Sequence, residues 1–393
     1  MANEVGERIA QLADEIGELG PANEQRGKLT DEAAKHLRDT GAIRLLQPGN
    51  HGGYQAHPRE FAENVMQLAA ADGSTGWVAG IVGVHPWELS FLDPKVQEEV
   101  WGDDQDTWMA SPYAPMGVAR PVDGGYIFNG HWQFSSGTDH CDWIFLGGLL
   151  GDEEGKPAKP MRSLHLVLPR SDYEIVEDSW DVAGLSGTGS KDIRVKDAFV
   201  PSYRTIDFGK IIEGEAPREA GLTDPLYHVP FSCVFPLGIT SAVVGITEGA
   251  LAHHLAYQRN RVAITGTKIK DDPYVLTAMS EAADEIAASR TALLDNASRM
   301  YDRVASGGEV TFDERAVGRR VQVQAAWRAV RAMDEIVARS GGNAMRKSNP
   351  LQRFWRDGHM GLSHAIHVPG SIFHASALTQ LGVDPPSSMT SMI

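Results

Sequence analysis

The chain contains 393 residues, of which 42% are hydrophobic and 22% charged, a composition typical of globular proteins rather than disordered or fibrous ones. Its 52 acidic and 36 basic residues give a formal net charge of −16, which argues against nucleic-acid binding because that affinity comes largely from basic residues. Only Cys141 and Cys233 occur, too few for a disulfide framework or a thiolate metal site. The N-terminal residues lack the apolar core of a signal peptide, and no run of eighteen apolar residues predicts a membrane-spanning helix. We therefore expect a soluble, acidic, cytoplasmic protein that binds neither nucleic acid nor membranes.

The first hundred residues carry helical patterning. Apolar side chains recur at three- and four-residue steps from Val5 to Leu19, the period of one helix face. Thr30 is a suitable N-cap for a second helix, and Pro58 and Pro94 suit the first turns of two more. These features predict an N-terminal α-helical domain over residues 1–106.

Between Thr107 and Pro201 the hydrophobic pattern changes to alternation with a period of two. Short segments between turn signals predict strands at 125–130, 143–148, 164–169 and 193–201. The spacing of the turns favours a small antiparallel barrel or sandwich. We predict a central antiparallel β-barrel domain over residues 107–232, whose last part, 202–232, is expected to be an irregular connection.

Helical patterning returns from about Leu237 to the end of the chain. Long helices are predicted over 272–305 and 312–339, the second ended by Gly341-Gly342. They indicate a C-terminal four-helix bundle over residues 233–393. The helical–β–helical order places the chain in the α+β class and excludes a doubly wound nucleotide fold, which requires βαβ units.

Three candidate chemical motifs have simpler explanations. The glycine-rich segment 184–191 is similar to a phosphate-binding loop, but strand-like residues follow it, so a turn joining two strands is the better interpretation. The 14 histidines include no HExxH motif, and their pairs lack carboxylates at ligand spacing, so no metal site is predicted. No GxSxG motif supports a nucleophilic hydrolase.

The segment from Arg353 to His367 is more informative. It carries two arginines, an aspartate and several histidines on a predicted helix that should break at Val368-Pro369-Gly370. Histidine exchanges protons near pH 7, and a helix end can present it to a cavity. A solvated helix face would explain the arginines and the aspartate, and a catalytic role for one of the histidines stays open at this point.

Together these motifs resemble the acyl-CoA dehydrogenase fold over essentially the whole chain. The matching motifs, in order, are Asn129-Gly130 with Phe134-Ser135-Ser136, the run from Gly184 to Pro201, Tyr257 with Arg261, and Gly341-Gly342 followed by Pro350, Arg353, Arg356 and Asp357. Members that abstract an α-proton commonly carry a glutamate after the Arg-Asp pair, where this sequence has Ala365 with His364 beside it. A thioester dehydrogenase would therefore lack its usual base here.

Within that superfamily, the chain is similar to the two-component (group D) flavin-dependent monooxygenases. The similar segments are GSTGWVAGIVGVHPW at 73–87, QEEVWG at 97–102, SPYAPMG at 111–117, FSSGTDH at 134–140 and QRFWRDGH at 352–359. The resemblance implies an enzyme that takes reduced flavin, FMNH2 or FADH2, from a separate NAD(P)H:flavin reductase and forms a C4a-hydroperoxyflavin with O2. A phenol then attacks the distal oxygen through its ortho carbon. Members act on phenolic secosteroids, 4-hydroxyphenylacetate, dibenzothiophene or indole-type substrates, and the fold usually forms a homotetramer.

The resemblance also implies roles for single residues. The predicted catalytic residues are His364 as acid or base, Ser136 as the hydrogen-bond partner of flavin N5, and His367 as the second choice of acid or base. His85 and Trp87 are predicted to bind the substrate, and Arg353 and Arg356 to form structural ion pairs. Predicted flavin contacts are Trp77, Ser111, Pro112, Tyr113, Phe134, Ser135, Ser136, Arg261, Gly342, Asn343, His364 and Ala365. An acyl-CoA dehydrogenase- or oxidase-like flavoprotein is the alternative enzyme, and a non-catalytic helical scaffold is the third hypothesis.

Overall fold

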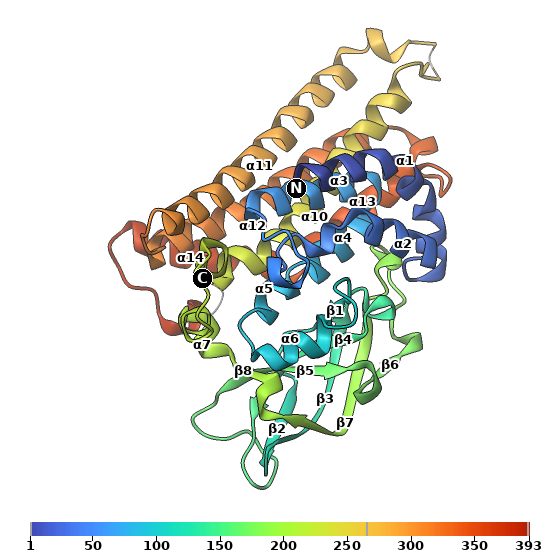
Figure 1. Cartoon of the computed structure of the whole chain (residues 1–393). Helices are drawn as coiled ribbons and strands as arrows, with labels where there is room; N and C mark the ends of the chain where they lie inside the picture. The colour runs from blue at the N-terminus through green and yellow to red at the C-terminus, as the bar shows by residue number, and fades with distance from the viewer. Residues whose placement is uncertain (1, 265, 391–392) are drawn as a thin grey trace.

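The computed structural model describes residues 2–264, 266–390 and 393. Figure 1 shows the helices gathered in one part of the molecule and the strands in a smaller part below them. The N-terminal and C-terminal helical segments share one core, because α10 (Phe231–Gln258) packs against both α3 (Pro58–Ala71) and α4 (Gly73–Val82). Residues far apart in the sequence therefore meet where these helices face the sheet.

The N-terminal helices largely follow the predicted pattern. They are α1 (Ala2–Arg26), α2 (Asp31–Thr40), α3, α4, α5 (His85–Leu89) and α6 (Pro94–Trp101). Thr30 caps α2 by accepting the N–H of Ala33, as predicted, and Gly41 ends the helix at φ 76°. Helices α4 and α5 were not predicted. Every residue of α4 is buried, so no apolar–polar alternation marks it as a helix.

The α+β class is confirmed, but the sheet differs from the predicted antiparallel barrel. Its strands are β1 (Met109–Ala110), β2 (Gly117–Val122), β3 (Gly125–Ser135), β4 (Trp143–Leu150), β5 (Ser163–Pro169), β6 (Glu174–Val176), β7 (Lys191–Pro201) and β8 (Thr205–Asp207). Within the described residues the pairing order is β6-β7-β3-β2-β4-β5-β8, which is open at both ends. Both β1 and β2 pair with β4 in parallel, so the sheet is mixed. Alternation of side chains shows which face of a strand is buried but not the direction of its neighbour.

The segment 202–232 is not the irregular connection that was predicted. It contains β8 and the short helices α7 (Phe208–Ile212), α8 (Glu215–Glu219) and α9 (Pro225–His228). Two of them begin at aspartate caps, since Asp207 accepts the N–H of Gly209 and Asp224 that of Leu226. Helices of four or five residues are too short to show a hydrophobic period.

The two longest C-terminal helices lie close to their predicted ranges, whereas the boundaries of the other helices differ from the prediction. The two longest are α11 (Pro273–Ala305) and α12 (Phe312–Ala338). Helix α10 begins at Phe231, earlier than the predicted Leu237, with Pro236 inside it. Helix α13 (Pro350–Leu362) ends before His364, and Pro369 begins α14 (Pro369–Gln380) instead of breaking a helix. Proline suits the first turn of a helix because the N–H it lacks has no partner there.

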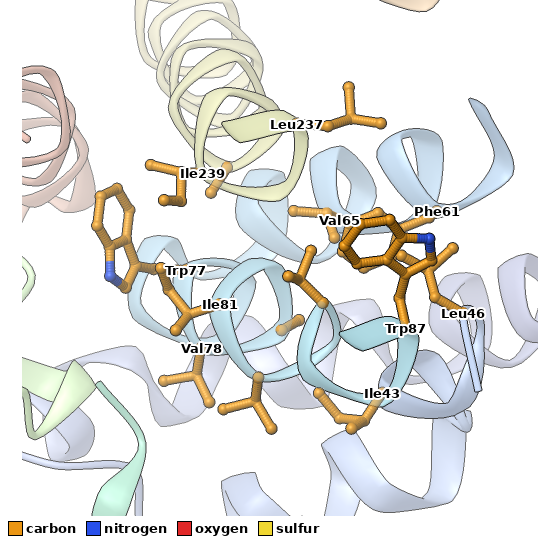
Figure 2. Close-up of a cluster of buried hydrophobic side chains, with 14 of the residues drawn as sticks. Ile43, Leu46, Phe61, Val65, Trp77, Val78, Ile81, Trp87, Leu237 and Ile239 are labelled. Atoms are coloured by element: carbon orange, nitrogen blue, oxygen red, sulfur yellow. The ribbon is translucent and has the colours of Figure 1, made fainter. Parts of the chain in front are cut away.

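Helix α10 forms the centre of the core. It is long and apolar enough to span a membrane, but 83% of its most apolar window is buried inside the protein, as in a core helix. Figure 2 shows Ile239 of this helix beside Trp77, while Trp87 lies at the other end of the cluster with Phe61 and Val65. Its length lets α10 contact groups at both ends of the helical part.

Candidate active site

Trp77 of α4 connects two of the predicted catalytic residues. Its indole N–H donates a hydrogen bond of 3.1 Å to the Oγ of Ser136, which follows β3. The ring of His364 lies against the same indole, with ring centroids 5.9 Å apart. Trp77 and Ser136 are buried, and His364 is partly exposed. The fold thus brings three predicted site residues from distant segments into one group.

Two more hydroxyl groups continue from Ser136. The Oγ of Ser136 is 2.7 Å from that of Ser190, which is 2.6 Å from the Oγ1 of Thr188. Thr188 in turn donates to the carbonyl of Leu185 at 2.7 Å. We call Ser136, Ser190 and Thr188 the hydroxyl chain. All three are buried, so their hydrogen bonds are made within the protein.

His364 uses one ring nitrogen to cap its own backbone. Its Nδ1 accepts the N–H of Ile366 at 3.2 Å and so begins the turn Ala365–His367. A neutral imidazole that accepts at Nδ1 carries its proton on Nε2. Burial, together with the charge of Arg319, lowers the pKa of His364 to about 4. At neutral pH the side chain is therefore a hydrogen-bond donor through Nε2.

His367 has no free ring nitrogen. Its Nδ1 lies 3.0 Å from the carbonyl of Gly361, and its Nε2 lies 3.2 Å from the Oγ1 of Thr240. The indole of Trp327 donates to its backbone carbonyl at 2.8 Å. Burial, followed by the neighbouring charge of His364, lowers its pKa to about 3. This neutral, fully bonded histidine fixes the turn that carries His364.

A second group of polar side chains surrounds His85 at the start of α5. The Nδ1 of His85 lies 2.8 Å from the hydroxyl of Tyr113, whose ring stacks on that of His165 at 4.5 Å. The Nδ1 of His165 lies 2.6 Å from the carboxylate of Glu88. We call His85, Tyr113, His165 and Glu88 the histidine–tyrosine cluster. Two of its atoms, Nε2 of His85 and Oε2 of Glu88, are buried without a hydrogen-bond partner among the residues that the structure describes.

The histidine–tyrosine cluster is enclosed by aromatic rings. Those that contact its members are Phe145, Phe208, Phe231 and Phe235, and Phe231 also stacks on Phe235. Burial and the charge of His165 lower the pKa of His85 to about 3. Phe235, which contacts Tyr113, and Thr240, which contacts His367, are five residues apart on α10, or about 7.5 Å along its axis.

Several predicted contact residues have structural partners. Trp87 is buried in the core and donates its indole N–H to the carbonyl of Leu226 at 3.0 Å. The carbonyl of Pro112 accepts the N–H of Gly147 in β4, and Ser111 is buried. Among these residues only Tyr113 joins a polar cluster through its side chain.

Phe134 and Ser135 lie at an irregular point of β3. The register between β3 and β7 shifts between Trp132 and Ser135, and Phe134 takes φ 68°, which is unusual for a bulky residue. Phe134 is 59% exposed and contacts Trp180 edge to face. Ser135 is fully buried, and its Oγ has no protein partner. The shift turns Ser136 toward Trp77 and leaves Phe134 on the surface.

Arg261, Gly342 and Asn343 form a separate group. Arg261 donates to the Oε1 of Gln258 at 3.1 Å and stacks on Tyr257, and a side chain at Gly341 would collide with its guanidinium. Gln258 and Thr240 are eighteen residues apart on α10, about 27 Å along the helix. Arg261 is therefore far from His364 within one chain.

The Arg-Asp pattern of α13 holds the hydroxyl chain in place. Asp357 accepts the N–H of Leu185 at 2.6 Å, and Arg356 donates to the carbonyl of Ala183. Arg356 also pairs with Glu24 at 2.7 Å, and the Nε of Arg353 lies 4.0 Å from the carboxylate of Asp72, the N-cap of α4. Both arginines thus form the structural ion pairs that were predicted, within one chain.

The glycine-rich segment 184–191 leads into β7, which confirms that it is a turn and not a phosphate loop.

Sequence reasoning missed Glu88, His165, Thr188 and Ser190. Glu88 stands three residues after His85, a spacing that places both on one helix face. Thr188 and Ser190 are two residues apart in a segment that was interpreted as a turn and as part of a family motif, without a role for either hydroxyl. His165 had no local signal, because it reaches the cluster only through the pairing of β4 with β5.

Comparison with known proteins gives consistent relatives over the full length. The family model of the acyl-CoA dehydrogenase C-terminal domain matches residues 237–369. The chain is 57% identical to a pigment production hydroxylase of Rhodococcus erythropolis over all of both chains. It is 41% identical to the flavin-dependent monooxygenase oxygenase subunit HsaA of Mycobacterium tuberculosis, covering 97% of this chain and 96% of the relative. The crystal structure of the 3-HSA hydroxylase from Rhodococcus sp. RHA1 superimposes with a TM-score of 0.93 at 39% identity, covering 98% of each chain.

Proposed function

This chain belongs to the oxygenase components of two-component flavin-dependent aromatic monooxygenases, and from that membership we propose that it ortho-hydroxylates a phenolic compound such as a secosteroid. The observation that carries the proposal is the meeting of Ser136 and His364 on the indole of Trp77. It supplies one hydroxyl and one imidazole where a thioester dehydrogenase would need a carboxylate. Ala365, at the position of that carboxylate, is exposed.

The residues present fit a flavin ring beside Trp77. When bound, reduced flavin activates O2 for transfer to the ring of the substrate. The Oγ of Ser136 is the partner that we assign to N5, and the buried indole of Trp77 holds this hydroxyl in place. Hydrogen bonding by neutral groups in a buried setting excludes water and stray protons from that position.

His364 has the role of a donor in this proposal. Because its Nδ1 accepts a backbone N–H, its Nε2–H is the group available to an oxygen atom in the site. Its lowered pKa, about 4, keeps it neutral at pH 7, so it donates a hydrogen bond without bringing a net charge. His367, with both ring nitrogens bonded, positions this turn.

His85 is the residue that we assign to the phenolic proton. The Tyr113 hydroxyl has one proton, and the neighbouring Glu88 carboxylate has a buried oxygen without a partner. Burial, followed by the charge of the Glu88 carboxylate, raises the pKa of Tyr113, so its hydroxyl stays protonated. His85 then donates its Nδ1 proton to Tyr113 and keeps a lone pair on Nε2. This nitrogen would accept the hydrogen bond of a substrate hydroxyl. The phenolate formed beside it would stabilise the imidazolium that burial disfavours in the free protein, where the pKa of His85 is about 3.

A homotetramer would complete the flavin site. Gln258, which Arg261 contacts, lies about 27 Å along α10 from Thr240, which contacts His367, so we infer that one FMN does not reach Arg261 and His364 of the same chain. Arg261 from a neighbouring copy, at the exposed end of α10, would bind the flavin phosphate. The expected partners are this second copy, a phenol and a diffusing NAD(P)H:flavin reductase, in the cytoplasm.

Arg261→Ala tests that assignment. Removing a charge-assisted hydrogen bond to phosphate should weaken flavin binding by about 1.5–3 kcal/mol. Titration calorimetry under anaerobic conditions measures the change, and Arg259→Ala, an exposed neighbour, is the control. Unchanged affinity in Arg261→Ala would remove this residue from the flavin site.

The decisive experiment supplies purified protein with reduced flavin, O2 and a panel of phenols, and identifies products by mass spectrometry. We expect addition of one oxygen ortho to the phenolic hydroxyl, without a requirement for contact with the reductase. Reduction of bound flavin by an acyl-CoA, in protein that purifies yellow, would support the dehydrogenase alternative instead. Full activity in His364→Ala would favour a scaffold role for that residue.

A further inference from the structure

The hydroxyl chain has a defined direction. It makes three contacts, Thr188 with the carbonyl of Leu185, Ser190 with Thr188, and Ser136 with Ser190. Three hydroxyl protons are available for them. A carbonyl oxygen can only accept, so the proton of Thr188 belongs to Leu185. Ser190 must then donate to Thr188, and Ser136 must donate to Ser190. Only this arrangement satisfies all three contacts.

The hydrogen bond on the other side of the Ser136 oxygen also has a fixed direction. An indole N–H can only donate, so Trp77 uses one lone pair of the Ser136 oxygen. Ser136 spends its own proton on Ser190 and has one lone pair left. Any further polar group that binds this oxygen must therefore donate a hydrogen bond to it.

The end of the hydroxyl chain at Thr188 and Leu185 is held rigidly. The N–H of Leu185 is bound by Asp357 at 2.6 Å, and the carbonyl of Thr188 accepts the N–H of Gly137 at 2.8 Å. A side chain at Gly184 would collide with the carbonyl of Arg356, so the loop packs directly on α13. The carbonyl that sets the direction therefore cannot turn away without disturbing α13.

We propose that Thr188 and Ser190 act as positioning residues that commit Ser136 to accepting a hydrogen bond, so that the site selects reduced over oxidised flavin. The inference rests on the proposed function, in which Ser136 faces flavin N5. Reduced flavin carries a proton on N5 and can donate to Ser136. Oxidised flavin has a lone pair on N5, which would face the remaining lone pair of Ser136. The hydroxyl chain thus favours binding before the reaction and release after it.

The test compares the affinities of both flavin forms by anaerobic calorimetry. Ser190→Ala frees the Ser136 proton, which can then bond to N5 of oxidised FMN. We expect the ratio of the oxidised to the reduced Kd to fall roughly tenfold, the scale of one buried hydrogen bond. Thr188→Val, which keeps the shape but lets Ser190 turn its proton toward Ser136, should lower the ratio in the same direction. Thr188→Ser should restore it.

Ser186→Ala is the matched control. Ser186 lies in the same loop, but its hydroxyl donates to the carbonyl of Val182 at 2.9 Å, outside the hydroxyl chain. The ratio of the oxidised to the reduced Kd in Ser186→Ala should equal that of the wild type. A change equal to that of Ser190→Ala would mean that loop stability, not hydroxyl direction, sets the preference, and would overturn the inference.

The outcomes separate this inference from the proposed function. Wild-type protein that binds reduced FMN and hydroxylates phenols, with an unchanged Kd ratio in Ser190→Ala and Thr188→Val, would overturn the inference alone. Wild-type protein that binds neither form would overturn both. If Ser190→Ala fails to fold, the near-isosteric pair Thr188→Val and Thr188→Ser decides the question.

Discussion

The hydroxyl chain and the histidine–tyrosine cluster are two buried networks that work in different ways. The chain of Ser136, Ser190 and Thr188 contains only neutral hydroxyls, and a carbonyl sets its direction. The cluster contains the carboxylate of Glu88 against His165, so a buried charge acts on Tyr113 and His85. The comparison teaches that one network controls which way a hydrogen bond points, whereas the other controls where a proton is held.

The largest expected effect comes from removing the charge of the cluster. Glu88→Leu leaves His165 without its buried acceptor, and breaking such a pair costs about 3–5 kcal/mol of unfolding free energy. Urea unfolding followed by circular dichroism measures it. Glu174→Gln, in an exposed pair with Arg194, should change stability by about 1 kcal/mol or less. A similar small loss in Glu88→Leu would show that the cluster does not depend on charge.

The second largest effect is expected from replacing His85, the proposed base of the histidine–tyrosine cluster. His85→Gln cannot accept a proton at neutral pH, so hydroxylation with reduced flavin should fall by about 100-fold, the lower range for general-base catalysis. Activity should recover as the pH rises and the phenol ionises by itself. Product formation against pH measures this. His131→Gln, an exposed histidine beside Asp192, serves as the control. A uniform loss at every pH would assign His85 a packing role.

The pH dependence of stability distinguishes His85 of the histidine–tyrosine cluster from Asp357, which binds the loop of the hydroxyl chain. The pKa of His85 falls from 6.5 to about 3 on folding, so between these values the unfolded chain binds more protons. Stability is therefore complete above pH 6.5 and is lost as the pH falls, by about 1.4 kcal/mol per pH unit for this residue. Asp357, whose pKa burial raises to about 7, contributes in the opposite direction. Urea unfolding of His85→Gln from pH 7 to 5 should show a shallower slope than the wild type, and an equal slope would contradict the assignment.

The smallest effect is expected in the hydroxyl chain. Ser136→Ala removes one neutral hydrogen bond, so H2O2 released per product should rise roughly threefold to tenfold, the scale of such a bond. Peroxide and product are measured in the same reaction. Ser186→Ala should keep the wild-type ratio of peroxide to product. An unchanged ratio in Ser136→Ala would separate Ser136 from the chemistry.

Local patterns predicted the helices far better than the sheet. Thr30 and the long runs of α11 and α12 carry their signals within one segment, as caps and periodicity. The pairing of β2 with β4 in parallel, and the short helices of 202–232, depend on contacts between distant segments. The family resemblance proposed Ser136, His85 and His364 as site residues, but it did not predict the hydrogen-bond partners of their side chains.

The amino-acid order by itself determined the α+β class, the long helices and the absence of a carboxylate at Ala365, which removes the usual base of a thioester dehydrogenase. Only the tertiary structure decided that His367 is fully bonded, that His364 is a donor, and that Ser136 ends a chain beginning at Leu185. The physical reason is that hydrogen-bond roles depend on which atoms lie within about 3 Å in space. Spacing along the chain does not contain that information for residues brought together by packing.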